Sequence, residues 1–141
     1  MAAPHKACPV VLRRAEDGSL EILAFQHPLA GRQLVKGTIE HGESPQAAAL
    51  RELAEEAGIT HAAVVRSLGT FEVGPPMQVW HAFVCEAGNL ADRWVHRTED
   101  DGGHDFRFFW QPLSAHVDES WHVIFCQALD RLKRVLASRE R

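Results

Sequence analysis

Three glutamates, Glu52, Glu55 and Glu56, are spaced so that their carboxylates can act together on one helix. At about 100° per residue they share one side, with Cβ atoms about 5–6 Å apart. The opposite side, which must pack, carries Leu50, Leu53, Ala54 and Ala57. Like charges at this spacing destabilise a helix by roughly 0.2–0.5 kcal/mol per pair, and no lysine is interleaved among them. Such a cluster is typical of a solvated acidic face or of a site for a divalent cation.

The loop before this helix adds oxygen ligands and backbone freedom. Gly37 and Gly42 carry no side chain, so the chain can turn tightly there and approach other groups closely. We expect the loop to bring Glu43 and main-chain carbonyls alongside the helical carboxylates. Because Mg²⁺ and Mn²⁺ prefer carboxylate, carbonyl and water ligands, these residues predict a Mg²⁺ site at which Mn²⁺ can substitute.

Residues that favour helix ends lie before and after the acidic helix. Ser44 is a favourable N-cap, Pro45 fits the first helical position, and Gly58 fits the left-handed residue that ends a helix. Apolar residues at helical spacing predict a second helix from near Asp118 or Ser120 to about residue 137. Extended segments are predicted at residues 6–14, 20–26, 33–36, 63–73, 77–86 and 106–110. Several strands with one central and one terminal helix indicate a layered α/β domain.

Length and composition exclude several classes of protein. With 141 residues, 45% of them hydrophobic, the chain can bury a core without disulfides, and we expect one domain over residues 1–141. Fifteen Lys and Arg against 19 Asp and Glu give a net charge of −4, which argues against a general nucleic-acid or membrane-surface binder. Cys8, Cys85 and Cys126 are widely spaced, which predicts free thiols in a reducing compartment. No apolar stretch is long enough for a membrane span or a secretion signal, so we expect a cytoplasmic protein.

Residues 37–59, GTIEHGESPQAAALRELAEEAGI, match the Nudix box G-x5-E-x7-R-E-U-x-E-E-x-G-U at every fixed position, where U is aliphatic. The matching residues are Gly37, Glu43, Arg51, Glu52, Leu53, Glu55, Glu56, Gly58 and Ile59. The chain therefore resembles the Nudix hydrolase family. Its length and its order of predicted elements also suit the fold of that family, an α/β/α sandwich around a mixed β-sheet.

This resemblance implies a reaction and a set of roles. Nudix enzymes use divalent metal ions to hydrolyse a phosphoanhydride bond in a nucleoside diphosphate that is linked to another group. The metal ligands that the resemblance implies are Glu52, Glu55, Glu56, Glu43 and the carbonyl of Gly37. Arg51 is implied to pair with acidic side chains and hold them in position. Bound cations would reverse the local charge of an acidic protein and so admit an anionic pyrophosphate.

The general base has two candidates in this sequence, because Nudix enzymes differ in this respect. Some use a glutamate of the box, which points to Glu56, with Glu55 beside it. Others use an acid from a loop in the C-terminal half, and the loop at residues 97–105 offers Glu99, Asp100 and Asp101 beside two glycines. The other interpretation of that loop, which the sequence favours, is an ordinary solvated turn.

The substrate stays open among a dinucleoside polyphosphate, ADP-ribose and a nucleoside triphosphate. Pro75, sixteen positions beyond the box, resembles a mark of ADP-ribose pyrophosphatases. Lys36 before Gly37 instead resembles dinucleoside polyphosphate hydrolases and RNA 5′-pyrophosphohydrolases, although an RNA 5′ end is not favoured. Lys36 and Arg32 are also candidate phosphate contacts.

A second class of function is a catalytically inactive Nudix module that binds a nucleotide or a partner protein as a regulator. Such modules typically lose one or more box glutamates, whereas this chain keeps all of them. A small-molecule nucleotide is therefore the expected partner. Both a monomer and a homodimer are compatible with the sequence.

Overall fold

The computed structural model of the chain describes residues 2–99 and 102–139. The elements of these residues follow the order β1 (His5–Arg14), β2 (Leu20–His27), β3 (Gly31–Gln33), β4 (Gly37–Thr38), α1 (Pro45–Glu52), η1 (Leu53–Ala57), β5 (Ala63–Val73), β6 (Gln78–Glu86), β7 (Trp94–Thr98), β8 (His104–Pro112) and α2 (Val123–Arg139). The segment η1 is a turn of π-helix that continues α1 without a break.

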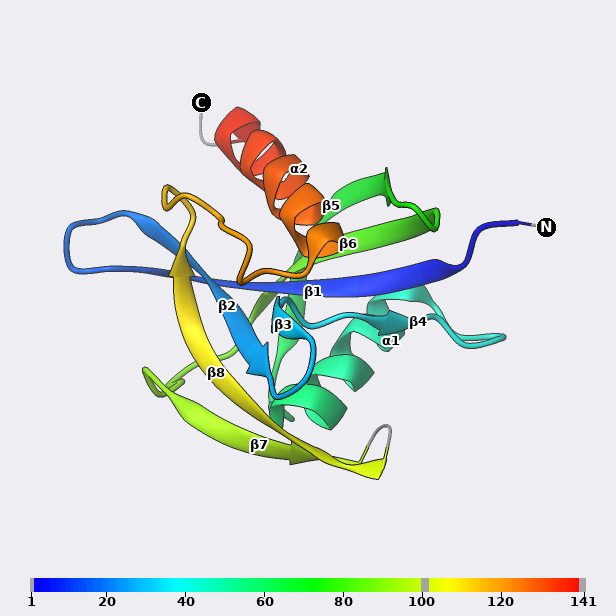
Figure 1. Cartoon of the computed structure of the whole chain (residues 1–141), viewed down its shortest axis with the longest axis horizontal. Coiled ribbons are helices and arrows are strands. Elements are labelled where there is room, and N and C mark those ends of the chain that lie inside the picture. Colours follow the sequence, from blue (N-terminus) through cyan, green and yellow to red (C-terminus); the bar gives the residue numbers. More distant parts are fainter. Residues whose placement is uncertain (1, 100–101, 140–141) are drawn as a thin grey trace.

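The described strands form one mixed eight-stranded sheet in which β1 joins two halves (Figure 1). The strand order is β5-β6-β1-β2-β8-β7, with β4 paired to β1 and β3 paired to β2. The first part of β1, from His5 to Val11, runs parallel to β6. Its last part, from Leu12 to Arg14, pairs antiparallel with β2. Because β4 is hydrogen-bonded to the start of β1, the residue that opens the box is held at the sheet.

The two helical segments cover opposite faces of the sheet. Alternate residues of β1 point to opposite sides, as the two-residue period of a strand requires. Ala7 packs on the side of α1 and η1, together with Leu53 and Phe108. Cys8 packs on the other side against α2, together with Trp80 and its neighbours. The predicted α/β sandwich around a mixed sheet is confirmed.

Three elements differ from the sequence-based expectation. Of the extended segment predicted at residues 33–36, only Gln33 lies in a strand, and residues 34–36 connect β3 to β4. The strand β7 was not predicted, because it is short and its outward Val95 is half exposed, so no clear alternation marks it. The helix α2 begins at Val123 rather than near Asp118 or Ser120. The preceding residues bond to β3 instead: Arg32 N–H donates to the carbonyl of Ser120 at 2.9 Å. These backbone groups are therefore not available for a helix.

The thiols agree with the prediction from their spacing. All three cysteines are free, and Cys8 and Cys85 are buried. Burial raises the pKa of the Cys85 thiol to about 11, so it is neutral at physiological pH. Among the described residues, no helix is both long and apolar enough to cross a membrane.

Candidate metal and catalytic site

The helix that carries the acidic cluster begins where its cap predicts. The Ser44 hydroxyl accepts a hydrogen bond from the Ala47 N–H at 3.1 Å, and Pro45 occupies the first turn. Ala48 and Ala49 are fully buried against the sheet. Their small side chains let α1 approach the sheet closely.

The end of the helix differs from an ideal α-helix. At Leu53 the chain changes to the π-turn η1, which Gly58 ends in the left-handed conformation at φ +73°. Only 5% of Glu52 and 8% of Glu56 is exposed, whereas the Glu55 side chain is about half exposed. The expectation that all three glutamates lie away from the packed side is therefore wrong for Glu52 and Glu56. The extra residue in a π-turn shifts the side chains that follow it, and such turns are frequent at functional sites.

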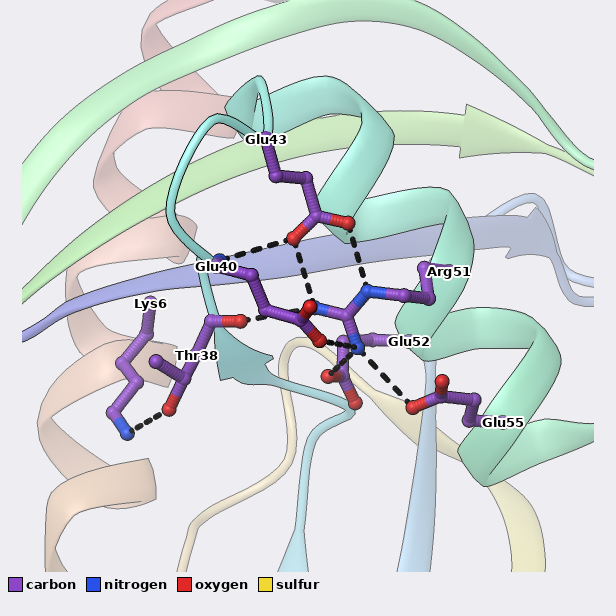
Figure 2. Close-up of polar contacts among 7 residues, drawn as sticks. All are labelled: Lys6, Thr38, Glu40, Glu43, Arg51, Glu52 and Glu55. Atoms are coloured by element: carbon purple, nitrogen blue, oxygen red, sulfur yellow. Dashed lines mark hydrogen bonds and ion pairs between the residues drawn. The ribbon is translucent and has the colours of Figure 1, made fainter.

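Arg51 connects the acidic groups of the box (Figure 2). Its Nε and Nη2 donate to the two carboxylate oxygens of Glu43 at 2.7 and 2.9 Å, a two-bond pairing. Its Nη1 lies 2.7 Å from a Glu52 oxygen and 3.2 Å from a Glu55 oxygen. Nη2 also donates to the carbonyl of Thr38 at 2.9 Å, which ties the loop to the helix.

The Arg51 contacts set the charge state of Glu43. The hydrogen bonds from Arg51, supported by the backbone N–H of Glu40, lower the pKa of Glu43 to about 2. Hydrogen bonds to Glu43 in turn raise the pKa of Arg51 above its ordinary value. Both groups are therefore fully charged at physiological pH.

The lowered pKa of Glu43 predicts a loss of stability in acid. Above pH 4.5, the ordinary pKa, the carboxyl is ionised in both the folded and the unfolded chain. As the pH falls from about 4.5 to about 2, the unfolded chain binds this proton first, so the stabilisation by ionised Glu43 disappears. Thermal unfolding across this range should show a smaller loss for Glu43→Gln than for the wild type. Equal losses in the two proteins would contradict the assignment.

Gly37 and Glu52 fit together at the wall of a cavity of about 430 Å³. A Cβ atom at Gly37 would overlap the carboxylate of Glu52, so any other residue there would force this carboxylate to move. The cavity is lined by Lys6, Lys36, Gly37, Thr38, Glu40, Arg51, Glu52, Glu55 and Glu56. It therefore brings together four of the five predicted metal ligands, whereas Glu43 does not line the cavity and is paired with Arg51.

Gly37→Ala is expected to weaken Mn²⁺ binding by on the order of 10- to 100-fold, because the new methyl group displaces the carboxylate of Glu52, a predicted metal ligand. Titration calorimetry measures this affinity directly. Gly88→Ala is the matched control, since nothing lies within 4 Å of the Cβ that it adds. If the two variants bind Mn²⁺ equally well, the close approach of Gly37 to Glu52 is irrelevant to the site.

The donor set fits Mg²⁺ or Mn²⁺ in kind, since it consists of carboxylate oxygens beside a backbone carbonyl. Within residues 2–99 and 102–139, no three acidic, histidine or cysteine side chains converge closely enough to hold an ion. The ion pairs of Arg51 explain this, because they draw Glu52 and Glu55 toward the guanidinium. In this arrangement, the cation that these two carboxylates contact is Arg51.

The cavity also holds Lys6 and Glu40, which were not singled out from the sequence, beside Lys36. Lys6 donates to the Thr38 hydroxyl at 2.7 Å (Figure 2). Lys36 lies over the ring of Trp80 at 5.8 Å, and its burial lowers its pKa. Glu40 lies 3.6 Å from Arg51. Glu40 occupies a variable position of the box, so only its acidic type could have indicated a role.

Lys36, named from the sequence as a candidate phosphate contact, lines this cavity, whereas Arg32 does not. The Arg32 guanidinium lies over the ring of Phe109, 4.9 Å from its centroid. The cations of the cavity are thus Lys6, Lys36 and Arg51, of which Arg51 is already paired with carboxylates.

The second candidate base, Glu99, lines a neighbouring cavity of about 390 Å³ together with Glu55 and His96. Glu55 borders both cavities, whereas Glu56 lines only the first of them and Glu99 only the second. Asp100 and Asp101 lie outside the described residues. The role of Glu99 as a base stays a prediction.

Comparison with known proteins identifies the family. A family model described as NUDIX domain matches residues 3–125, which is most of the chain. The chain belongs to the Nudix family. This membership confirms the resemblance carried by the box and supports the prediction of a pyrophosphohydrolase enzyme. None of the curated proteins matches the sequence significantly.

Solved structures share the Nudix fold at low sequence identity. A Nudix hydrolase from M. smegmatis, RenU, is 19% identical with a TM-score of 0.71, and the match covers 98% of this chain and 89% of that one. A C. elegans Ap4A hydrolase is 21% identical with a TM-score of 0.67, covering 96% and 99%. A UDP-X diphosphatase is 16% identical with a TM-score of 0.70; the match covers 99% of this chain but only 65% of that one.

Proposed function

We propose that this Nudix protein hydrolyses a phosphoanhydride bond in a nucleoside diphosphate derivative, with Mg²⁺ as its cofactor and Mn²⁺ as a substitute. The observation that carries the proposal is the cavity in which Gly37, Glu52, Glu55 and Glu56 form one wall. Lys6 and Lys36 also line it, so groups that attract cations and groups that attract phosphate border the same space. That combination suits a substrate whose pyrophosphate bridges metal ions and lysines.

The residues that would hold the metal are Glu52, Glu55 and Glu56, with the Gly37 carbonyl as a further ligand. The bound ion would stabilise charge on the phosphate oxygens and lower the pKa of the attacking water. Glu43 remains paired with Arg51 and acts on the site through it. Arg51 orients the carboxylates of Glu52 and Glu55.

The chemical step that we propose is attack by water on one phosphorus of the anhydride. A P–O bond forms to the water oxygen, and the bond to the bridging oxygen breaks, leaving two phosphate products. A carboxylate takes the proton of the attacking water, with Glu56 as the first candidate and Glu99 as the second. Lys6 and Lys36 bind phosphate oxygens and hold the substrate in the cavity.

The substrate class is a small-molecule nucleotide, and three members of it stay as candidates: a dinucleoside polyphosphate, ADP-ribose and a nucleoside triphosphate. The Ap4A hydrolase and the UDP-X diphosphatase share the fold of this chain, and their names report two different substrates. Their low identity means that neither substrate transfers to this chain on similarity alone.

The proposal is tested by a substrate panel with Mg²⁺ and with Mn²⁺, whose products are separated by chromatography. We expect metal-dependent release of a nucleoside monophosphate, inorganic pyrophosphate or a nucleoside polyphosphate from at least one substrate. Chelation by EDTA should abolish the release. Tight nucleotide binding without hydrolysis across the panel would instead favour the inactive regulatory module.

A further inference from the structure

Two side chains of β7 hold the end of the turn that carries Glu55 and Glu56. The indole Nε1–H of Trp94 donates to the carbonyl of Ala57 at 3.0 Å. Nε2 of His96 lies 3.0 Å from the carbonyl of Glu55. Because a carbonyl oxygen only accepts, Nε2 of His96 carries a hydrogen and donates it.

These hydrogen bonds satisfy backbone groups that a helix end otherwise leaves open. Gly58 ends η1 in the left-handed conformation, and a Cβ atom there would lie 2.7 Å from Nδ1 of His96. The ring of His96 is therefore packed directly on the end of η1. Trp94 is held in turn by stacking on Phe108, with ring centroids 5.0 Å apart and planes 10° from parallel.

We propose that Trp94 and His96 are positioning residues for the metal site, an inference that rests on the proposed function. They anchor the carbonyls of residues 55 and 57, one on each side of Glu56. With both anchors in place, the turn keeps Glu56 buried at the cavity and Glu55 at its border. Without them, the last turn frays and the two carboxylates spread over many positions, which weakens metal binding.

Trp94→Phe tests this proposal, because it removes one donor and keeps an aromatic ring to stack on Phe108. The matched control is Trp110→Phe. Trp110 also lies on a strand and donates its indole N–H to a backbone carbonyl, that of Ala91 at 3.1 Å, away from η1. Calorimetry should show Mn²⁺ binding weakened on the order of 10-fold in Trp94→Phe and changed less than about 2-fold in Trp110→Phe.

His96 allows a rescue experiment at the second anchor. His96→Leu removes the donor to the Glu55 carbonyl, whereas His96→Gln supplies an amide donor in its place. We expect His96→Leu to weaken Mn²⁺ binding as Trp94→Phe does, and His96→Gln to restore part of the affinity. If His96 served folding alone, both variants would lower the melting temperature, and His96→Leu and His96→Gln would bind Mn²⁺ with the same affinity.

Amide hydrogen exchange of residues 53–59, measured without metal, gives an independent readout. Exchange should be faster in Trp94→Phe and His96→Leu than in the wild type, and unchanged in Trp110→Phe. Equal Mn²⁺ affinity and equal exchange in Trp94→Phe and Trp110→Phe would overturn the positioning role. If the wild type binds no Mn²⁺, the proposed function is wrong, and the exchange rates alone decide whether β7 holds the turn.

Discussion

Glu56→Gln is expected to lower kcat by about 10²- to 10⁴-fold, the range for loss of an acid–base or metal-binding group. Glutamine has almost the same shape but no negative charge, so it neither accepts the proton of water nor binds a cation strongly. Glu56 is 8% exposed and borders the cavity, so the substitution removes a charge from the acidic wall itself. The measurement is steady-state turnover on the best substrate of the panel, with thermal unfolding to verify the fold.

Glu99→Gln is the comparison that separates the two candidate bases. Glu99 borders the neighbouring cavity with Glu55 and does not line the one that contains Glu56. If Glu56 binds metal and also takes the proton, Glu99→Gln should leave kcat nearly unchanged. If Glu99 is the base, both variants lose turnover, but only Glu56→Gln also loses Mn²⁺ affinity. Turnover of Glu56→Gln within threefold of the wild type would remove Glu56 from the mechanism.

Arg51→Gln is expected to have the second large effect, on stability and on activity together. It leaves the carboxylates of Glu43 and Glu52 without their cation, and Glu52 is largely buried. Breaking a buried ion pair costs about 3–5 kcal/mol, and we expect about 3 kcal/mol because Arg51 keeps a quarter of its surface exposed. Denaturant unfolding measures this loss of stability. The value of kcat/KM should also fall, because the carboxylates of Glu52 and Glu55 are no longer held in position by Arg51.

Two further variants show whether the geometry of Arg51 matters beyond its charge. Arg51→Lys keeps a cation but cannot make the two-bond pairing with Glu43, so it should recover part of the stability and little of the activity. Arg134→Gln is the surface control, since Arg134 pairs with Asp130 on the exposed side of α2. Exposed pairs contribute about 0–1 kcal/mol. If Arg51→Gln and Arg134→Gln lower the free energy of unfolding and kcat/KM equally, the proposed role of Arg51 in holding the acidic residues is wrong.

The boundaries of the acidic helix and its acidic residues were predictable because they depend on local chemistry. Ser44 caps the helix through its own hydroxyl, and Gly58 ends it through its left-handed backbone, so each is visible in a few neighbouring residues. The box also identified the glutamates by type and spacing. The fold class followed from the same patterns, and the family match confirms it.

The rest depends on contacts between distant segments. Glu52 precedes the π-turn, and its carboxylate lies against Gly37 and Arg51. The π-turn that carries Glu56 is hydrogen-bonded to Trp94 and His96, about forty residues further along the chain. A helical wheel shows none of these contacts, so it could not show that Glu52 and Glu56 are buried. The late start of α2 depends on hydrogen bonds to β3. Lys6 lines the cavity because its strand, β1, pairs with β4. The residues next to Lys6 in the sequence do not indicate this pairing.

Anomalous diffraction from crystals grown with Mn²⁺ tests the central claim most directly. The account predicts a manganese peak at the cavity wall formed by Glu52, Glu55 and Glu56, and loss of that peak in Glu56→Gln. A fully folded protein that shows no manganese at these carboxylates, in crystals grown with saturating Mn²⁺, would contradict it.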